Sequence, residues 1–255
     1  MSARSVTGLA IRFSQKVQQH KPNMKKQNSI KLDHVTPRQS LSYFAALALL
    51  AASGGSVLAA ETITVKPEEA LKRLQVGNER FVAGTPTQTT KDGKRRAEVA
   101  QGQKPFAIVV SCSDSRVGPE VVFDQGLGDI FVVRTAGHVV DDVGLGSVEY
   151  AVEHLGATLI LVLGHERCGA VAATVAGGEA HGHLPAIVKA IKPAVTKSKG
   201  QPGDAVDNAV RAQVLEVATQ LQKAGPVLAE RVKAGKLKVV GARYDLDTGR
   251  VEVIE

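Results

Sequence analysis

The sequence predicts an α/β fold in which a mostly parallel sheet is flanked by helices. Three short apolar runs, each long enough for a buried strand, alternate with segments of helical periodicity. Strands joined by helices run parallel in a single sheet. The part of the chain that follows a distinct N-terminal segment, residues 60–255, is long enough to form one domain with a substantial core.

The first half of this domain is expected to form helix, loop, strand, helix and strand in that order. Leu71 and Leu74 lie on one face of a helix over 66–84, with Pro67 in its first turn and Gly84 at its end. A polar loop with one short helix follows it, and then two apolar strands separated by a helix that begins at a proline. These elements are helix 95–100, strand 106–110, helix 119–123 and strand 130–133.

The second half begins with a helix whose apolar residues are in phase, and a buried strand follows. A further helix starts at Gly169, and a glycine-rich loop separates it from two longer helices, of which Asp204 can cap the second. A short helix precedes two strands that the turn sequence Asp-Leu-Asp-Thr-Gly joins as a hairpin. The expected elements are helix 146–155, strand 158–163, helices 169–175, 185–197, 205–224 and 226–234, and strands 237–244 and 250–254.

The N-terminal segment, residues 1–59, has the features of a secretory signal. A basic lead precedes an apolar run over 40–50 and a small-residue end, which predicts cleavage after Ala59 or Ala60. The true start is either Met1 or Met24. The apolar run is short of the ~20 residues needed to span a bilayer, so we expect no stable membrane anchor after cleavage, and a retained anchor is the alternative.

Charge separates the same two parts of the chain. Residues 1–60 hold eight Lys or Arg and one Asp, so that +8 − 1 = +7 accounts for the whole net charge of the protein. The remainder is neutral, with 24 basic and 24 acidic residues, which argues against nucleic acid as a partner. The expected location is periplasmic or secreted.

The two cysteines of the chain each follow an apolar run, where ligand sites gather in parallel sheets. Cys112 opens Cys-Ser-Asp-Ser-Arg, and Cys168 lies in His-Glu-Arg-Cys-Gly after His165. Two thiolates and an imidazole from the start of a helix form a three-ligand zinc set that leaves the fourth position open for water or substrate. The alternatives are a disulfide between the two cysteines, or small buried side chains without a metal.

Asp114 and Arg116 accompany this set within the first motif. A carboxylate two residues from a zinc ligand can reach the metal or its water. An arginine two residues further on can hold that carboxylate in a bidentate ion pair. Held by Arg116, Asp114 stays off the metal and accepts a hydrogen bond instead. The alternative is a surface ion pair that contributes little.

The chain resembles the β-class carbonic anhydrases in the motifs around Cys112 and Cys168, and also in Gly-Asn-Glu-Arg-Phe (77–81) and Arg-Thr-Ala-Gly (134–137). The resemblance covers about residues 67–255. It implies the fold of that family, with a mostly parallel sheet, flanking helices and a protruding N-terminal helix. It also implies reversible hydration of CO2 to bicarbonate and a proton by zinc-bound hydroxide.

By position, the resemblance also assigns roles to single residues. Asp114 and Arg116 match the catalytic pair, and Asp114 would ligate the metal only in a closed state. The matching zinc ligands are Cys112, His165 and Cys168; the matching substrate-binding residues are Gln103, Phe131, Tyr150 and Gly169, where Phe131 and Tyr150 could equally be core packing.

Two features refine the resemblance. The chain has Gln103 and no tryptophan, which favours the plant-type subclass whose active site stays open. His138 departs from the asparagine that many relatives have after Arg-x-Ala-Gly. Two thiolate ligands should leave the bound water less acidic than three imidazoles would, so activity should rise on the alkaline side of neutrality.

The family implies a homodimer or a higher homo-oligomer in which the first helix embraces a neighbouring subunit. Three rival functions follow from the same residues. They are hydrolysis of CS2 or COS by the same fold, a zinc module without catalysis, and a thiol redox protein.

Overall fold

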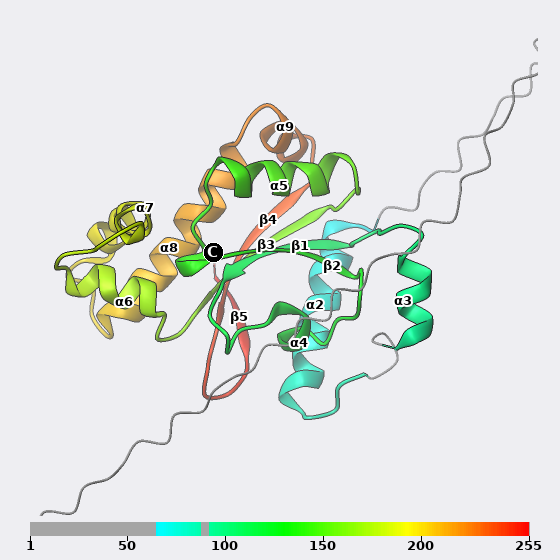
Figure 1. Ribbon diagram of the computed structural model, residues 1–255, viewed down its shortest axis with the longest axis horizontal. Coiled ribbons are helices and arrows are strands. Elements are labelled where there is room, and N and C mark those ends of the chain that lie inside the picture. The colour runs from blue at the N-terminus through cyan, green and yellow to red at the C-terminus, as the bar shows by residue number, and fades with distance from the viewer. Residues whose placement is uncertain (1–64, 88–91, 255) are drawn as a thin grey trace, which may run out of the picture. The chain divides into compact units, whose positions relative to one another are not determined.

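A five-stranded sheet with the order β2-β1-β3-β4-β5 forms the centre of the molecule (Figure 1). The computed structural model describes residues 65–87 and 92–254, so the predicted signal segment lies outside the described residues. The first four strands are parallel and β5 pairs antiparallel with β4. The strands are β1 Ala107–Cys112, β2 Ile130–Thr135, β3 Leu159–His165, β4 Lys238–Tyr244 and β5 Val251–Ile254.

Helices cover both faces of this sheet. Apolar side chains of α5, α8 and α9 pack on one face, and those of α2 and α4 pack on the other. The parallel α/β fold predicted from the sequence is therefore confirmed. The helices are α2 Pro67–Val82, α3 Gly93–Val99, α4 Pro119–Val122, α5 Asp142–Glu153, α6 Gly169–Ala176, α7 Leu184–Ser198, α8 Ala205–Lys223 and α9 Val227–Lys233, with a 3-10 turn η1 at Ala136–His138.

Several predicted boundaries need correction. β1 and β2 each extend two residues further than the apolar runs indicated, to Cys112 and Thr135. α5 begins at Asp142 instead of Gly146 because the Asp141 side chain accepts the Gly144 N–H and caps the helix. Asp92 moves the start of α3 to Gly93 in the same way. The sequence placed both His165 and Cys168 at the start of a helix. In the structure His165 is the last residue of β3, and of the two only Cys168 occupies the N-cap position of a helix.

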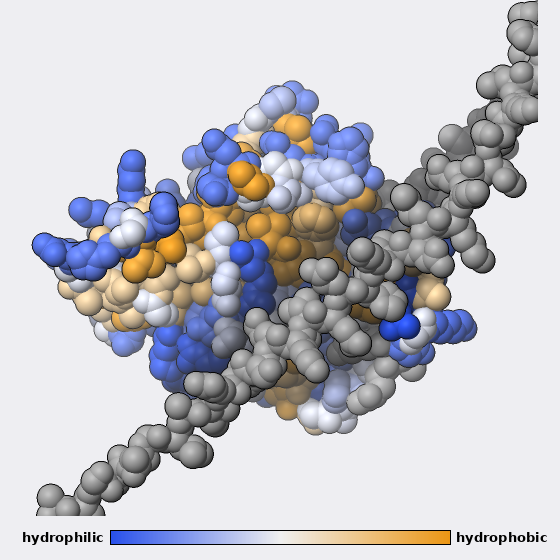
Figure 2. Space-filling model, in the orientation of Figure 1, coloured by the Kyte–Doolittle hydropathy of each residue, from blue (hydrophilic) through white to orange (hydrophobic). Residues whose placement is uncertain are grey.

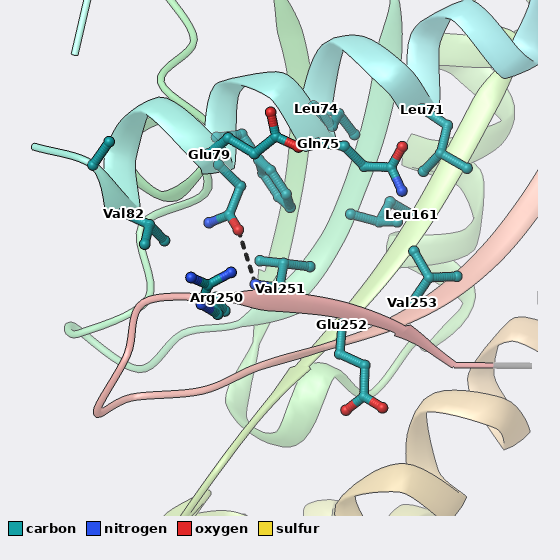
Figure 3. Close-up of a pocket in the computed structure, with 13 residues that line it drawn as sticks. Leu71, Leu74, Gln75, Glu79, Val82, Leu161, Arg250, Val251, Glu252 and Val253 are labelled. Carbon is teal, nitrogen blue, oxygen red and sulfur yellow. Dashed lines mark hydrogen bonds between the residues drawn. The ribbon is translucent and has the colours of Figure 1, made fainter. Parts of the chain in front are cut away.

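The α2 helix is fixed to the rest of the fold by side chains from one short stretch. Gly77 lets the helix approach α4, because a Cβ there would lie 1.8 Å from the Phe123 carbonyl oxygen. Asn78 donates to the carbonyls of Val122 and Gly249, at 3.0 and 2.8 Å, and accepts the Val251 N–H at 2.9 Å. α2 and β5 also border a cavity of about 740 Å³ that contains none of the predicted site residues (Figure 3).

Within residues 65–87 and 92–254, no helix has both the length and the apolar character needed to cross a bilayer.

The strand order places β1 at the point where the chain changes direction in the sheet. From β1 the chain adds β2 on one side, and it then returns to add β3 on the other side. The carboxyl ends of the strands at such a switch point leave a crevice where ligands bind in open α/β sheets. Cys112 ends β1 and His165 ends β3, so both lie at this position.

Candidate metal centre

Three side chains meet at the carboxyl ends of β1 and β3. Cys112 and His165 end these two adjacent parallel strands, and Cys168 caps α6 after a tight turn. The two sulfur atoms are 4.0 Å apart, and one ligand atom from each of the three residues lies within 4.8 Å of the others. All three residues are buried. Sequence positions 112, 165 and 168 are thus brought to a single point.

The donor set fits a zinc ion. Nδ1 of His165 lies 2.9 Å from the carbonyl oxygen of Glu166, which orients the ring and makes Nδ1 the natural N–H donor. Nε2 of His165 is buried and has no hydrogen-bond partner among the described residues. An unpartnered imidazole nitrogen facing two thiols is the arrangement expected of a Cys2His zinc site with an open fourth position.

The surroundings of the two sulfurs favour the thiolate that a metal needs. The Cys168 thiol holds the pKa of Cys112 well below its usual range, and His165 and the Gly137 N–H add to this. The proton shared with Cys112, together with burial, raises the pKa of Cys168. A bound cation would displace that remaining proton, because metal coordination deprotonates a thiol outright.

Asp114 borders the metal centre and is held by Arg116. The guanidinium donates from Nε to Oδ1 at 2.9 Å and from Nη2 to Oδ2 at 2.7 Å, and the Arg116 N–H also donates to Oδ1. The Arg116 side chain therefore holds the pKa of Asp114 well below its usual range, so the carboxylate is ionised at neutral pH. Oδ2 of Asp114 lies 3.7 Å from Nε2 of His165, so the carboxylate is next to the nitrogen that would bind the metal.

Arg134 supports the same turn, a role that its place in the Arg-Thr-Ala-Gly motif did not reveal. Its guanidinium donates to the carbonyl oxygens of Cys112 at 2.9 Å, Asp114 at 2.7 Å and Val117 at 3.0 Å. Because Arg134 fixes the backbone on both sides of Asp114, it orients the carboxylate relative to Cys112. No sequence pattern predicts contacts between an arginine side chain and distant backbone carbonyls.

A second unpredicted support comes from the β4–β5 hairpin. Arg167 lies between His165 and Cys168 in the sequence and has a left-handed backbone conformation, with φ of 50°. Its guanidinium nitrogens donate to the two carboxylate oxygens of Asp247 at 2.9 and 2.7 Å, which makes a bidentate ion pair. The neighbouring acidic groups Glu166, Asp245 and Asp247 lie close together, and they pair with Arg167 and Arg243, which offset part of their negative charge.

The predicted substrate-binding residues divide into two groups. Gly169 begins α6 directly after Cys168, where the first backbone N–H groups of a helix have no intrahelical acceptor. Gln103 is exposed and precedes β1, at the strand end opposite to Cys112. Phe131 pairs with Ile108 in the register of β1 and β2, whereas Cys112 pairs with Thr135. Four residues along a strand correspond to ~13 Å, so Phe131 lies away from the metal centre of its own chain.

Tyr150 belongs to the same distant group. Its ring centroid lies 6.4 Å from that of Phe131, and 48% of the residue is exposed. One chain therefore brings the metal-ligand residues, Asp114, Arg116 and Gly169 together, but it does not bring Gln103, Phe131 or Tyr150 to them. The roles assigned to all of these residues stay predictions.

Comparisons with known proteins show which family the sequence matches. The family model described as carbonic anhydrase matches residues 107–251. Carbonic anhydrase 2 of Mycobacterium tuberculosis is 45% identical over 188 residues, which cover 72% of this chain and 91% of the relative. The carbonic anhydrase of Mycolicibacterium smegmatis is also 45% identical, over 73% of this chain and 93% of the relative.

Solved structures show the same fold. The β-carbonic anhydrase CcaA superposes with a TM-score of 0.59 at 25% identity, over 72% of this chain and 95% of that chain. A Coccomyxa β-carbonic anhydrase in complex with acetazolamide superposes with a TM-score of 0.57 at 28% identity, over 72% and 86% of the two chains.

Proposed function

The chain belongs to the β-class carbonic anhydrase family, and on this premise we propose that it catalyses the reversible hydration of CO2 to bicarbonate and a proton with Cys112, His165 and Cys168 as zinc ligands. The observation that carries the proposal is the buried, unpartnered Nε2 of His165 beside two thiols. Zinc, when bound, lowers the pKa of a coordinated water towards neutrality and so supplies the nucleophile.

Asp114 and Arg116 have distinct tasks in this reaction. Asp114 has both oxygens occupied by Arg116, so it remains an ionised hydrogen-bond acceptor beside the open position. An ionised acceptor orients a donor O–H next to it and thereby directs a lone pair towards CO2. The exposed Arg116 adds a positive charge at the mouth of the site, where the anionic product leaves.

The site belongs to the open subclass of the family under this proposal. Three observations support that assignment: the Arg116 pair holds Asp114, Gln103 is present, and the chain has no tryptophan. In a closed site Asp114 would leave Arg116 and occupy the fourth position at the metal. Simple, non-cooperative product inhibition by added bicarbonate supports the open form, and cooperative inhibition by bicarbonate contradicts it.

A homo-oligomer completes the pocket under the same proposal. Gln103, Phe131 and Tyr150 lie away from the metal centre of their own chain, so they can line a CO2 pocket only at the metal centre of a second copy. β2 is an edge strand whose residues from Ile130 to Val133 are only partly buried. Figure 2 shows an apolar area in the middle of the side of the molecule that faces the viewer, and apolar patches of that kind mark interaction sites.

The oligomer is tested by light scattering together with a mixing experiment. An inactive Cys168→Ser chain and an inactive Tyr150→Ala chain, unfolded and refolded together, should regain part of the activity because one mixed pocket is intact. A monomeric mass, or no regain of activity in mixtures that form oligomers, contradicts the proposal.

Export through a cleaved signal is the expected route to the periplasm or the medium. The features that support it are the basic lead, the apolar run and Ala59 in residues 1–60. Mass spectrometry of the protein from the periplasmic fraction should give an N-terminus at Ala60 or Glu61. Full-length protein recovered in the cytoplasm contradicts export.

One assay separates the proposed reaction from its rivals. Stopped-flow CO2 hydration is measured on the mature chain, with zinc content determined on the same sample. Activity with about one zinc per chain supports the proposal. Zinc without turnover indicates a binding module, sulfide release from CS2 without CO2 hydration indicates the related hydrolase, and two titratable thiols without metal indicate a redox protein.

A further inference from the structure

His138 is completely buried although its ring is polar. Neither ring nitrogen has a hydrogen-bond partner among the described residues. A buried polar group without a partner destabilises the folded state, because its hydrogen bonds to water are lost and not replaced. The backbone is unusual as well, because Gly137 and His138 both have left-handed conformations, with φ of 68° and 45°. Such a combination calls for an explanation from what surrounds the residue.

The His138 ring lies beside β3, the strand that carries the metal ligand His165. A Cβ built on Gly164 would be 3.4 Å from Cε1 of His138, and Gly164 immediately precedes the ligand His165. The same Cβ would be 2.5 Å from Val214, so α8 closes the space on the other side. The ring therefore packs against β3 next to the ligand His165, while it is Val214 of α8, and not the ring, that a side chain at position 164 would meet too closely. Burial lowers the pKa of His138 from 6.5 to about 4, so the ring is neutral near pH 7.

The turn that carries His138 contacts a metal ligand through its backbone. The Gly137 N–H donates to Sγ of Cys112 at 3.3 Å. Gly137 is enclosed on its other side, since a Cβ there would lie 2.6 Å from Cδ1 of Ile191 and 3.3 Å from the Ala170 side chain. Small displacements of η1 are thus transmitted to the sulfur of Cys112. An N–H bond to a metal-bound thiolate withdraws charge from the sulfur, and contacts of this kind tune the metal.

We propose that His138 is a positioning residue for the metal centre: it accommodates the left-handed backbone of the turn and its side chain packs beside Gly164, so that the turn stays fixed and the Gly137 N–H points at the Cys112 sulfur. The inference rests on the proposed zinc site. A side chain that only filled space would leave the donor strength of the sulfur unchanged. A side chain that holds the turn changes that strength when it is removed, even though it is not itself a ligand.

The test compares His138→Ala and His138→Asn with a matched exposed control, His154→Ala. Asparagine tolerates a left-handed backbone better than other residues that have a Cβ, so it should preserve the turn. The measurements are the zinc dissociation constant by chelator competition and the sulfur-to-cobalt charge-transfer band of the Co²⁺-substituted protein. Circular dichroism on the same samples reports folding.

His138→Ala should weaken zinc binding by about 10-fold or more and shift the charge-transfer band. His138→Asn should stay within about 3-fold of the parent, and the control should match the parent in both readouts. If His138→Ala does not fold, His138→Gln replaces it and must show the same loss, because glutamine lacks the tolerance of asparagine for this backbone.

A folded His138→Ala or His138→Gln variant with the parental zinc affinity and band position would overturn the inference. Equal losses in the Asn and Ala variants would also overturn it, because tolerance of the left-handed backbone would then not be what holds the turn. Failure of the proposed zinc site gives a different result, since the parent protein would then bind neither Zn²⁺ nor Co²⁺ at its thiols, and failure of catalysis alone would leave these two readouts of the parent unchanged.

Discussion

Two buried polar clusters in this fold differ in how completely their atoms are partnered. The α2 cluster consists of Asn78, Arg80 and Asp124, and the metal cluster consists of Cys112, His165 and Cys168. In the α2 cluster Asn78 makes three hydrogen bonds, and Asp124 accepts from Arg80 and from Thr87. In the metal cluster Nε2 of His165 has no partner, and the sulfurs contact mainly each other and the Gly137 N–H.

This difference separates polar residues that build the fold from those that bind a ligand. Buried polar groups are ordinarily satisfied, so a satisfied cluster needs nothing from outside. A cluster with a free imidazole nitrogen and two adjacent thiols is complete only when a cation is bound. We therefore expect substitutions in the metal cluster to affect chemistry first, and substitutions in the α2 cluster to affect stability first.

The largest expected effect is in the metal cluster. Cys168→Ser should reduce CO2 hydration to the uncatalysed rate and zinc content to well below one per chain, because an alcohol does not replace a thiolate at zinc. Elemental analysis and a hydration assay on one sample measure both quantities. Parental zinc content in the variant would contradict the assigned ligand.

Asp114→Asn is expected to be next in size. Replacing the ionised acceptor should lower kcat/KM by about 10²–10⁴-fold, the range usual for a group that directs proton transfer. Zinc content should not change, since Asp114 is held by Arg116 and lies outside the ligand set. Loss of zinc along with activity would mean that Asp114 is a ligand.

Asn78→Ala examines the other cluster. Two carbonyls and one N–H would lose their partner, so the free energy of unfolding should fall by about 2–4 kcal/mol. Urea unfolding measures this loss, and kcat/KM and zinc per folded chain at a temperature where the variant is folded should equal the parental values. A variant with parental stability but reduced turnover would remove the distinction between the clusters.

The smallest effect concerns pH. His138 has a folded pKa of about 4 against an ordinary value near 6.5, so between these values the unfolded chain binds more protons than the folded chain. Stability should therefore fall as pH decreases through this window, by about 2 kcal/mol between pH 7 and pH 5. His138→Asn should lack this part of the decrease when urea unfolding of both metal-free proteins is compared at the two pH values.

Much of the fold followed from local patterns in the sequence. Apolar runs and helical periods predicted the order of strands and helices, and Asp204 caps α8 as expected, by accepting the Asp207 N–H. Boundaries were less predictable. Cys112 and His165 extend their strands because neighbouring strands supply hydrogen bonds, which no local pattern shows.

The site was predictable where it depends on a short motif. Asp114 and Arg116 are two residues apart, so their pairing follows from spacing alone, and the Cys and His residues are typical zinc donors. The contacts of Arg134, Arg167 and His138 could not be predicted, since each joins segments that only the folded sheet brings together. The distance between Phe131 and the metal centre depends on strand register, which was equally hidden.

The positions of Cys112 and Cys168 have a consequence beyond catalysis. The two residues are 56 positions apart in the chain and belong to segments that flank the middle of the sheet. An ion bound by both cysteines would act as a reversible cross-link that joins the two ends of the segment between them. Because the ion binds the folded chain and not the unfolded one, it stabilises the fold by a binding free energy that grows with the concentration of free metal. The bound metal would then raise the thermal stability of the enzyme. Removing it with a chelator should lower the melting temperature together with the turnover.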